Sequence, residues 1–482
     1  MNFVEDVLER FPAAQAALVA IDEGGERRVW GFGELIARSA GLAGAMQARG
    51  VGRGDVVITL IGNRSEWVLA MLACFRIGAV ALPCNTQLRD KDLELRVAVA
   101  GPKLAIGAAA LLATLPGGVA TMDLDEVAAV LDEERPQQPP AEPADLAAGD
   151  PALIVFTSGT TGEPRAAVHS QAYLSGQRLQ AEHWFGARAG ELAWCTAASG
   201  WSKSARNAFI APWLCGATAL IHDGRFDPAE RLEICEREGV NVLCQAPTEY
   251  RMLAKRTELR PIAGLRRLVS AGEPLNPEVI RAFRDDPGLD IHDGYGQTET
   301  GALTGAVVGA ELRDGSMGKP LPGIELRITD GELQLRRASC PTFFSRYIGS
   351  EPFAEEWWRT GDLVSTDEDG YLWFEGRSDD VILSSGYRIG PFEVESALIS
   401  HPAVSEAAVV GAPDPERGSV VRAIVVLRSG VPGDELAREL QEHVKEQTAP
   451  YKYPRIVEFA ESLPKTASGK IKRAELRAGG AA

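Results

Sequence analysis

Residues 156–165 read Phe-Thr-Ser-Gly-Thr-Thr-Gly-Glu-Pro-Arg and directly follow the apolar run Ala152-Leu-Ile-Val-Phe156. The apolar run predicts a buried strand, and the segment after it predicts a loop rich in hydroxyls and glycines. Glycines let a loop turn several backbone N–H groups toward one point, and Ser and Thr hydroxyls add donors. Such a loop can bind a polyphosphate, although it lacks the Gly-Lys-Ser/Thr of a Walker A loop. A loop of this composition is more often a plain linker, so the remaining sequence has to decide.

Length and composition limit the possible classes of protein. A chain of 482 residues is long enough for two or more domains with a large core. Its content of 45% hydrophobic and 24% charged residues is that of an ordinary soluble globular protein. The formal net charge of −17 argues against a surface for nucleic acid, which needs clustered Lys and Arg. A basic pocket for a nucleotide stays possible, because net charge does not describe one cleft.

The cysteine pattern and the apolar stretches predict a cytoplasmic protein. The seven cysteines are scattered and form no C-x-x-C pair, which favours reduced thiols over disulfides or a zinc site. The start, Met1-Asn-Phe-Val-Glu-Asp6, is acidic and lacks the apolar core of a signal peptide. The densest apolar stretch, residues 68–75, is too short to span a bilayer. The oligomeric state is left open.

The first half of the chain alternates strand-like and helix-like segments. Ser65 is the expected N-cap of the first clear helix, and Gly78 is expected to end it. The pattern predicts strands at 56–61, 79–82 and 103–106, a helix that begins at 65–66 and runs through Phe75, and a second helix at 90–99. Strand–helix–strand repetition favours a doubly wound α/β sheet.

The composition and the expected elements change at two later points of the chain. Residues 132–150 contain Pro136, Pro139, Pro140 and Pro143 and predict a surface connector before the Thr/Gly loop. After residue 362, short β-type segments at 381–383, 407–410 and 420–427 flank helices at 391–400 and 434–448. This part predicts a small α+β domain. We place the boundary between residues 1–378 and residues 379–482.

Several unusual peptides follow the Thr/Gly loop in a fixed order. They are Ser270-Ala-Gly-Glu-Pro274, Asp293-Gly-Tyr-Gly-Gln-Thr-Glu-Thr-Gly301, Arg359-Thr-Gly-Asp362, Gly376-Arg-Ser-Asp-Asp-Val-Ile382, Ser385-Gly-Tyr-Arg-Ile-Gly-Pro391 and Pro464-Lys-Thr-Ala-Ser-Gly-Lys470. Together they resemble the signature motifs of the adenylate-forming superfamily, which comprises acyl-CoA synthetases, adenylation domains and luciferases. The resemblance covers nearly the whole chain. It is greatest to the medium-chain acyl-CoA synthetases, through Trp194-Cys-Thr196, Gly200-Trp201, Asp223-Gly-Arg-Phe226 and Ala246-Pro-Thr-Glu-Tyr250.

The resemblance implies a fold and a reaction. The fold is α/β, with a large N-terminal adenylate-forming domain built on doubly wound sheets and a small mobile C-terminal α+β domain. Enzymes of this superfamily activate a carboxylate with ATP to an acyl-adenylate plus pyrophosphate. They then transfer the acyl group to the thiol of CoA. The implied substrates and cofactors are therefore a carboxylic acid, ATP, Mg²⁺ and CoA.

The resemblance also assigns the nucleotide contacts. The β- and γ-phosphates are expected at Thr157, Ser158, Gly159, Thr160, Thr161, Gly162 and Arg165, where the superfamily usually has Lys at the last position. Arg165 keeps the charge but presents a planar fork. The segment lining the adenine matches Gly272, Glu273 and Pro274.

The second nucleotide motif supplies an aromatic face and polar groups. Tyr295 is expected to face the adenine, although alone it would fit a core residue. The neighbouring contacts are expected from Asp293, Gly294, Gly296, Gln297 and, near the α-phosphate, Thr298. Glu299 is the candidate Mg²⁺ ligand, because this hard cation takes carboxylate and phosphate oxygens.

The remaining catalytic positions lie in the later motifs. Asp362 is expected to accept hydrogen bonds from the ribose hydroxyls, and Arg377 and Arg388 to contact the ribose or phosphates. Lys470 is the expected catalytic lysine, whose ammonium would reach both the carboxylate oxygen and the α-phosphate. With Thr298 and Glu299 it forms the expected catalytic set.

The resemblance further places a hinge at Asp379 and a CoA channel beyond it. Ser385, Gly386 and Tyr387 are expected to border the pantetheine arm, and Arg417 to meet CoA phosphates. The basic-aromatic run Tyr451-Lys-Tyr-Pro-Arg455 is a further candidate for the CoA phosphates. Solvated loop charges are an equally good interpretation of any one of these residues.

The acyl pocket is expected between Trp201 and Gly296. Acetate-specific relatives carry Trp where this chain has Gly296, so the pocket is expected to admit a longer acid, since each buried CH₂ contributes about 0.8 kcal/mol. Trp201 could equally be a core residue. The alternatives are a benzoate-like aryl-CoA ligase or an acyl-AMP ligase serving a carrier protein; the lack of a carrier or condensation domain in the sequence favours free CoA. A non-catalytic nucleotide-binding regulator is the remote alternative, because the charged reaction residues are retained.

Overall fold

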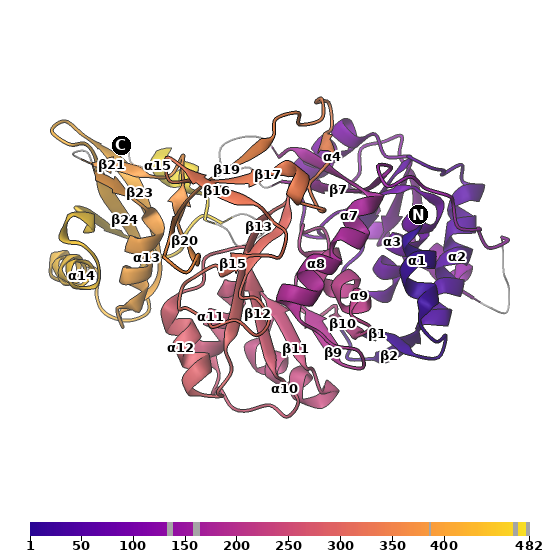
Figure 1. Cartoon of the computed structure of the whole chain (residues 1–482), viewed down its shortest axis with the longest axis horizontal. Coiled ribbons are helices and arrows are strands. Elements are labelled where there is room, and N and C mark those ends of the chain that lie inside the picture. The colour runs from indigo at the N-terminus through magenta and orange to yellow at the C-terminus, as the bar shows by residue number, and fades with distance from the viewer. Residues whose placement is uncertain (133–137, 158–163, 385–386, 466–470, 479–482) are drawn as a thin grey trace.

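The computed structural model describes residues 1–132, 138–157, 164–384, 387–465 and 471–478 (Figure 1). The chain forms a large N-terminal domain and, at the other end of the molecule, a smaller C-terminal domain (Figure 1). The predicted α/β fold class is confirmed. Within the described ranges, no helix is both long and apolar enough to cross a membrane.

The first large sheet has seven strands in the order β18-β8-β7-β4-β3-β5-β6. Its five strands from β7 to β6 run parallel, and β8 and β18 are added antiparallel at one edge. The predicted strand before the Thr/Gly loop is β7, which ends at Phe156. The bounds are β3 (Val56–Leu60), β4 (Val80–Pro83), β5 (Leu104–Gly107), β6 (Ala120–Asp123), β7 (Pro151–Phe156), β8 (Ala166–Ser170) and β18 (Arg346–Tyr347).

The second large sheet has nine strands in the order β15-β14-β13-β12-β11-β9-β10-β1-β2. Its middle strands are parallel, while β14, β15 and β2 are antiparallel additions at the two edges. The bounds are β1 (Ala16–Ile21), β2 (Arg27–Gly31), β9 (Leu192–Cys195), β10 (Thr218–His222), β11 (Val242–Gln245), β12 (Arg267–Ala271), β13 (Ile291–Gln297), β14 (Gly301–Gly305) and β15 (Lys319–Pro320).

A four-stranded antiparallel sheet in the order β16-β17-β19-β20 lies between these sheets and the C-terminal domain along the chain. Its strands are β16 (Leu326–Thr329), β17 (Glu332–Arg336), β19 (Trp357–Thr366) and β20 (Leu372–Arg377). The helices of the large domain are α1 (Phe3–Val7), α2 (Phe32–Ala48), α3 (Ser65–Ile77), α4 (Asp90–Ala100), α5 (Ala109–Leu112), α6 (Leu124–Val130), α7 (Gln171–Gly176), α8 (Arg178–Gln180), α9 (Ala211–Leu214), α10 (Pro228–Glu238), α11 (Pro247–Arg256) and α12 (Pro277–Asp285), with π-helices η2 (Ala181–Phe185) and η3 (Arg206–Ile210).

The residues at the two ends of helix α3 show how the local sequence determines where a helix begins and ends. Gly78 ends the helix in a left-handed conformation with φ of 73°, as predicted, because glycine adopts positive φ without strain. The predicted N-cap is wrong: Arg64 occupies the cap with extended backbone, and Ser65 is the first helical residue. The Ser65 hydroxyl instead donates to Glu66 Oε2 at 3.2 Å.

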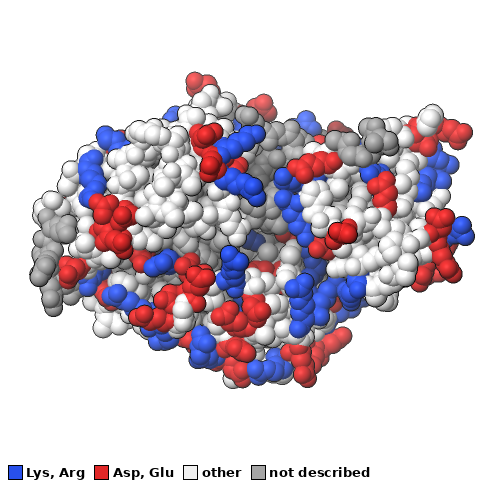
Figure 2. All heavy atoms as spheres, turned by 180° about the vertical axis from the view of Figure 1, so that it is seen from behind, with Lys and Arg blue, Asp and Glu red and all other residues white. Residues whose placement is uncertain are grey.

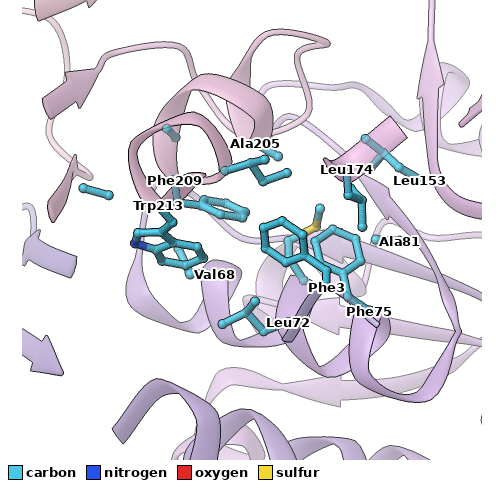
Figure 3. Close-up of a cluster of buried hydrophobic side chains, with 14 of the residues drawn as sticks. Phe3, Val68, Leu72, Phe75, Ala81, Leu153, Leu174, Ala205, Phe209 and Trp213 are labelled. Carbon is cyan, nitrogen blue, oxygen red and sulfur yellow. The ribbon is translucent and has the colours of Figure 1, made fainter. Parts of the chain in front are cut away.

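The two large sheets share one hydrophobic core. Strands of both sheets contribute to it, among them β3 and β7 of the first and β9 and β11 of the second. Helix α3 is buried along its length from Trp67 to Ile77. Figure 3 shows its side chains meeting Phe209 and Trp213, which come from η3 and α9. The Phe209 and Trp213 ring centroids are 5.0 Å apart, and Phe209 lies 5.4 Å from the Trp67 ring.

The connector before β7 is less exposed than predicted. Most of its described residues face solvent, but Ala141 and Leu146 are buried. Arg76 holds this segment, because its Nε donates to Ala141 O at 2.6 Å and its carbonyl accepts from the Ala144 N–H at 2.8 Å. All seven cysteines lie within the described residues and are free thiols, as the sequence predicts.

The C-terminal domain has a hydrophobic core of its own, formed by residues between Ile382 and Phe459. Helix α13 has the predicted limits, and α14 ends one residue earlier than predicted. The boundary after residue 378 stays a prediction. The elements are β21 (Ile382–Ser384), β22 (Tyr387–Ile389), α13 (Pro391–Ser400), β23 (Val404–Asp414), β24 (Gly418–Leu427), α14 (Asp434–Gln447), β25 (Ile456–Phe459) and α15 (Arg473–Ala478).

We expect Phe209→Ala to lower the stability of the large domain by about 3–5 kcal/mol, because it removes a fully buried ring and leaves a cavity between α3 and α9. Phe209→Leu should cost clearly less. Urea-induced unfolding, read as the shift in midpoint, measures both. Val431→Ala, at an exposed position, is the control. A midpoint for Phe209→Ala equal to that of the control would contradict this description of the core.

Candidate active site

The predicted nucleotide residues lie at or just beyond the carboxyl ends of strands. The Thr/Gly loop follows β7, Gly272 follows β12, and β13 itself carries Tyr295 to Gln297. Figure 2 shows Lys and Arg side chains gathered along a hollow in the middle of one face of the molecule. In α/β folds, ligands bind at the edge of the sheet that is formed by the carboxyl ends of the strands. Some of the predicted site residues lie outside the described residues. They are Ser158, Gly159, Thr160, Thr161, Gly162, Ser385, Gly386 and Lys470, together with the side chain of Arg388.

Three of the predicted residues converge on the buried carboxylate of a fourth, Asp362. The Tyr295 hydroxyl and Gln297 Nε2 donate to Asp362 Oδ2 at 2.5 and 2.8 Å. Arg377 Nη1 donates to Asp362 Oδ1 at 3.0 Å, because β19 and β20 pair these two residues directly. Burial raises the pKa of Asp362, and the charge of Arg377 opposes that shift. The structure thus joins β13, β19 and β20 at Asp362.

The Asp362 cluster limits what its members can bind. Each carboxylate oxygen accepts about two hydrogen bonds, so ribose hydroxyls would share Asp362 with these partners. Tyr295 directs its hydroxyl to Asp362, and its ring packs against the neighbouring apolar clusters. Burial, followed by the charge of Asp362, raises the pKa of Tyr295. The adenine and ribose contacts of these residues stay predictions.

A second cluster forms beside the phosphate loop. The N–H of Thr157 donates to Arg165 O at 2.8 Å, which closes the base of the loop. The Arg165 guanidinium lies 3.4 Å from the ring centroid of Tyr347. The Tyr347 hydroxyl donates to Glu299 Oε1 at 2.6 Å. Burial and the Glu299 charge raise the pKa of Tyr347. Tyr347 therefore links the basic residue of the loop to the predicted Mg²⁺ ligand.

Sequence reasoning missed Tyr347. It stands in Phe344-Ser-Arg-Tyr-Ile348, a stretch without a motif. Its position depends on the short strand β18, which pairs with β8 at the edge of the first sheet. Only the tertiary structure brings that strand to the phosphate loop.

The motif predicted to line the adenine turns partly toward α11. Glu273 Oε2 accepts from Thr248 Oγ1 at 2.7 Å and lies 3.6 Å from Arg251 Nη2. Gly272 has a φ of 106°, which other residues rarely adopt. Lys203 Nζ donates to Ala271 O at 2.7 Å, next to this glycine. The segment after Trp201, predicted to border the acyl pocket, therefore reaches the adenine-lining motif.

Gly296 has no free space beside its α-carbon. A Cβ at this position would lie 1.8 Å from Gly301 O, because β13 and β14 pair closely after an irregularity at Tyr295. Any side chain at residue 296 would force β14 to move. The role of Gly296 in the acyl pocket stays a prediction, but a bulky substitution there would test the fold of this hairpin as much as the pocket.

The carboxyl group of Asp293 is buried, and its pKa is raised. Burial raises its pKa to about 8, although the Gly294 N–H and the Ser270 hydroxyl favour the charged form. Its Oδ1 has no hydrogen-bond partner among the described residues. The side chain is therefore neutral over much of the range below pH 8 and can donate a hydrogen bond.

The predicted hinge and CoA residues lie in the C-terminal part. Asp379 Oδ1 is 3.4 Å from Arg377 Nε, so the hinge candidate is next to the Asp362 cluster. The exposed rings of Tyr387 and Tyr451 stack with centroids 4.3 Å apart. The structure thus brings together two of the segments predicted for CoA. Arg417 lies in the β23–β24 turn, where its N–H donates to Asp414 Oδ1 at 2.8 Å.

The sequence of the chain matches the models of two known protein families. A model described as AMP-binding enzyme matches residues 4–339, and one described as AMP-binding enzyme C-terminal domain matches residues 393–470. The chain belongs to the AMP-binding enzyme family. The resemblance predicted from the motifs is confirmed at this level.

Members of this AMP-binding family resemble the chain over its whole length. YtcI of Bacillus subtilis, an acyl–CoA ligase described as uncharacterized, is 40% identical over 99% of this chain and 95% of its own. The mitochondrial acyl-coenzyme A synthetase ACSM3 of Mus musculus is 38% identical over 99% and 90%. The solved structure of the anthranilate CoA ligase AuaEII with anthranoyl-AMP superposes with a TM-score of 0.88 at 29% identity, covering 100% of this chain and 97% of that one.

The raised pKa of Asp293 predicts a pH-dependent stability. An unfolded Asp has a pKa near 3.9, so between about pH 4 and 8 the folded chain holds a proton that the unfolded chain has released. Stability should therefore fall as the pH rises through this window. Asp293→Asn cannot ionise and should gain thermal stability over the wild type between pH 5 and 8. Asp285→Asn, at an exposed position, is the control. Parallel melting profiles for wild type and Asp293→Asn would contradict a buried neutral carboxyl.

Proposed function

We propose that this chain is an AMP-forming acyl-CoA synthetase. It activates a carboxylic acid with ATP to an acyl-adenylate, releases pyrophosphate, and transfers the acyl group to the thiol of CoA. The observation that carries the proposal is the convergence of Tyr295, Gln297 and Arg377 on Asp362, in a chain that belongs to the AMP-binding enzyme family. The names of the full-length relatives, an acyl–CoA ligase and an acyl-coenzyme A synthetase, support the same reaction class.

In the first half-reaction, a carboxylate oxygen of the acid attacks the α-phosphorus of ATP. The bond from that phosphorus to the bridging oxygen breaks, and pyrophosphate leaves. The loop from Thr157 to Arg165 would hold the β- and γ-phosphates, and Thr298 and Lys470 would stabilise the charge that develops at the α-phosphate. The role of Lys470 is supported by its motif, Pro464-Lys-Thr-Ala-Ser-Gly-Lys470.

Mg²⁺ suits this arrangement. The described residues contain no cluster of three side chains able to hold a metal ion, and Glu299 supplies one carboxylate beside the phosphate loop. Mg²⁺ is commonly bound by one or two carboxylates and by the phosphates of its nucleotide. Glu299 would hold the ion, which would neutralise phosphate charge, and the Tyr347 hydroxyl would fix the orientation of that carboxylate.

In the second half-reaction, the CoA sulfur attacks the acyl carbonyl carbon, its proton is released, and AMP leaves. We propose that the C-terminal domain turns about Asp379 between the two steps. The Ser385-Gly386-Tyr387 segment would then border the pantetheine arm, and Arg417 would approach the CoA phosphates. The stacking of Tyr387 on Tyr451 supports one continuous surface for this purpose.

The substrate we propose is an acid longer than acetate, in the medium-chain range. An aryl acid is the second candidate, because the anthranilate CoA ligase shares the fold over the whole chain. The seven free thiols support a reducing compartment, and we propose the cytoplasm.

Two substitutions should block different half-reactions. Lys470→Ala should nearly abolish adenylate formation, followed as ATP–pyrophosphate exchange, but leave CoA transfer from supplied acyl-adenylate largely intact. Asp379→Pro fixes φ near −65° and should do the reverse, keeping the exchange while acyl-CoA production falls by orders of magnitude.

Lys472→Ala is the matched control for Lys470, since Lys472 pairs with Glu475 at 2.8 Å on the surface. Pyrophosphate release from ATP that does not depend on an added carboxylic acid would refute the proposed function. Equal loss of both half-reactions in Lys470→Ala would refute the separate roles, and normal acyl-CoA synthesis by a folded Asp379→Pro would refute the hinge.

Tyr347→Phe tests the orientation of Glu299. The substitution keeps the ring beneath Arg165 and removes only the hydroxyl that donates to Glu299. We expect the affinity for ATP with Mg²⁺ to fall about tenfold, the effect of losing one hydrogen bond to a charged group. Titration calorimetry with Mg²⁺, and again with EDTA, makes the measurement. A loss of the same size without Mg²⁺ would show that Tyr347 does not act through the metal ligand.

A further inference from the structure

Arg206 is a buried cation without an ion pair among the described residues. It begins the π-helix η3 and is 7% exposed. Its Nε and Nη1 have no hydrogen-bond partner among the described residues. Burying a guanidinium is costly unless acceptors replace its water. π-helical turns also occur frequently at functional sites.

The other buried arginines of the chain have acceptors. Arg267 donates to three backbone carbonyls, among them Trp184 O at 2.7 Å. Arg422 binds the Glu458 carboxylate at 2.6 Å, and Arg231 lies 3.4 Å from Glu249 Oε1. Arg76 donates to Ala141 O at 2.6 Å. Arg206 differs from all four, because the acceptor beside it is the Tyr173 hydroxyl, not a carbonyl or a carboxylate, and the neutral ring of His169 also lies near it.

These neighbours do not neutralise its charge. The His169 and Tyr173 rings lie 4.1 Å apart, centroid to centroid. Burial, and then the charge of Arg206, lowers the pKa of His169 to about 3, so the imidazole is neutral. Neither ring nitrogen has a partner of hydrogen-bond geometry, although the Thr298 backbone is beside the ring. The side-chain amide of Gln177, also beside Tyr173, is likewise unpartnered among the described residues.

The cluster of Arg206, His169, Tyr173 and Gln177 adjoins the predicted acyl pocket. A Cβ at Gly301 would lie 3.7 Å from Arg206 Nη1, and Gly301 is the residue whose carbonyl faces Gly296. Trp201 and Lys203 precede Arg206 on the same segment. Figure 3 shows Ala205 and Phe209 of this segment in the hydrophobic core. The Arg206 side chain points away from that core, toward His169 of β8 and Gly301 at the start of β14.

We propose that the Arg206 cluster binds an oxygen acceptor at the far end of the acyl chain, so that the preferred acid carries a second polar group, such as a carboxylate or a hydroxyl. The proposal rests on the proposed acyl-CoA synthetase function and deepens it. The guanidinium supplies charged donors, and the neutral imidazole and the Gln177 amide can each donate or accept. A hydrocarbon tail would offer no acceptor to the Nε and Nη1 atoms of Arg206, which have none among the described residues.

The test compares matched acids. Acyl-CoA formation is measured as kcat/KM for C4 to C8 acids in three forms, unsubstituted, ω-hydroxy and ω-carboxy. We expect the wild type to prefer an oxygen-bearing acid by about tenfold to a hundredfold over its unsubstituted equivalent, the range for hydrogen bonds to a charged group. A preference for the carboxylate identifies a dicarboxylic acid, and a preference for the hydroxyl identifies a hydroxy acid. A preference for unsubstituted acids at every length overturns the proposal, even without a variant.

Arg206→Met removes the charge at similar volume and should reverse the preference toward unsubstituted acids, while KM for ATP stays unchanged. Arg206→Lys should retain part of the preference. Arg267→Met is the matched control: it also removes a buried arginine, but it should reduce stability without changing the ratio between acids. An equal loss for all acids in Arg206→Met overturns the proposal, because the guanidinium would then act on the reacting carboxylate. If no acid of any form yields acyl-CoA with the wild type, the proposed function itself fails.

Discussion

The geometry of the site depends on the hydrogen bonds that the buried carboxylate of Asp362 accepts. It accepts hydrogen bonds from β13 through Tyr295 and Gln297 and from β20 through Arg377. A carboxylate this deeply buried is stable only when its oxygens are bonded, so the three partners are held as firmly as the strands that carry them. Two of the partners belong to the second large sheet and one to the strand that ends just before the C-terminal domain. The same cluster therefore joins the second large sheet to the strand that precedes the predicted domain boundary.

The cluster also explains why the hinge candidate lies where it does. Arg377 divides its guanidinium between Asp362 and Asp379, which are 3.0 and 3.4 Å from its nitrogens. Movement at Asp379 would change the electrostatic surroundings of Arg377, and through it those of Asp362. Two further contacts cross from the large domain to the small one: Asn276 Nδ2 donates to Ser396 Oγ at 3.0 Å, and Lys255 Nζ to Ser405 O at 3.3 Å. Among the described residues, few polar contacts of this kind would need to break for the proposed reorientation.

The Thr/Gly loop and the Arg206 cluster show two ways of holding an arginine, the first exposed and the second buried. Arg165 lies on the ring of Tyr347, whose hydroxyl in turn binds Glu299, so the cation and the carboxylate share one aromatic residue. Arg206 has neutral neighbours, and its Nε and Nη1 have no partner among the described residues. The first arrangement pairs its cation and its carboxylate through one side chain. In the second, two nitrogens of the cation have no acceptor in the described part of the chain, and this is why we assign it to the substrate.

The sequence by itself determined the fold class, several of the strands and helices, and the order of the motifs. The apolar run before the Thr/Gly loop, the glycine after α3 and the helix at 391–400 are local signals, since each depends on residues adjacent along the chain. Ser65 shows the limit of such signals, because a residue suited to an N-cap became the first residue of the helix. Only the tertiary structure decided that Tyr347 would reach Glu299, that the backbone of Gly301 would fill the space beside Gly296, and that Arg206 would be buried without a counter-ion among the described residues. These features join residues that lie between five positions apart, as Gly296 and Gly301 do, and 95 positions apart, as Arg206 and Gly301 do. Their geometry depends on how the sheets pair and pack, which no local pattern in the sequence encodes.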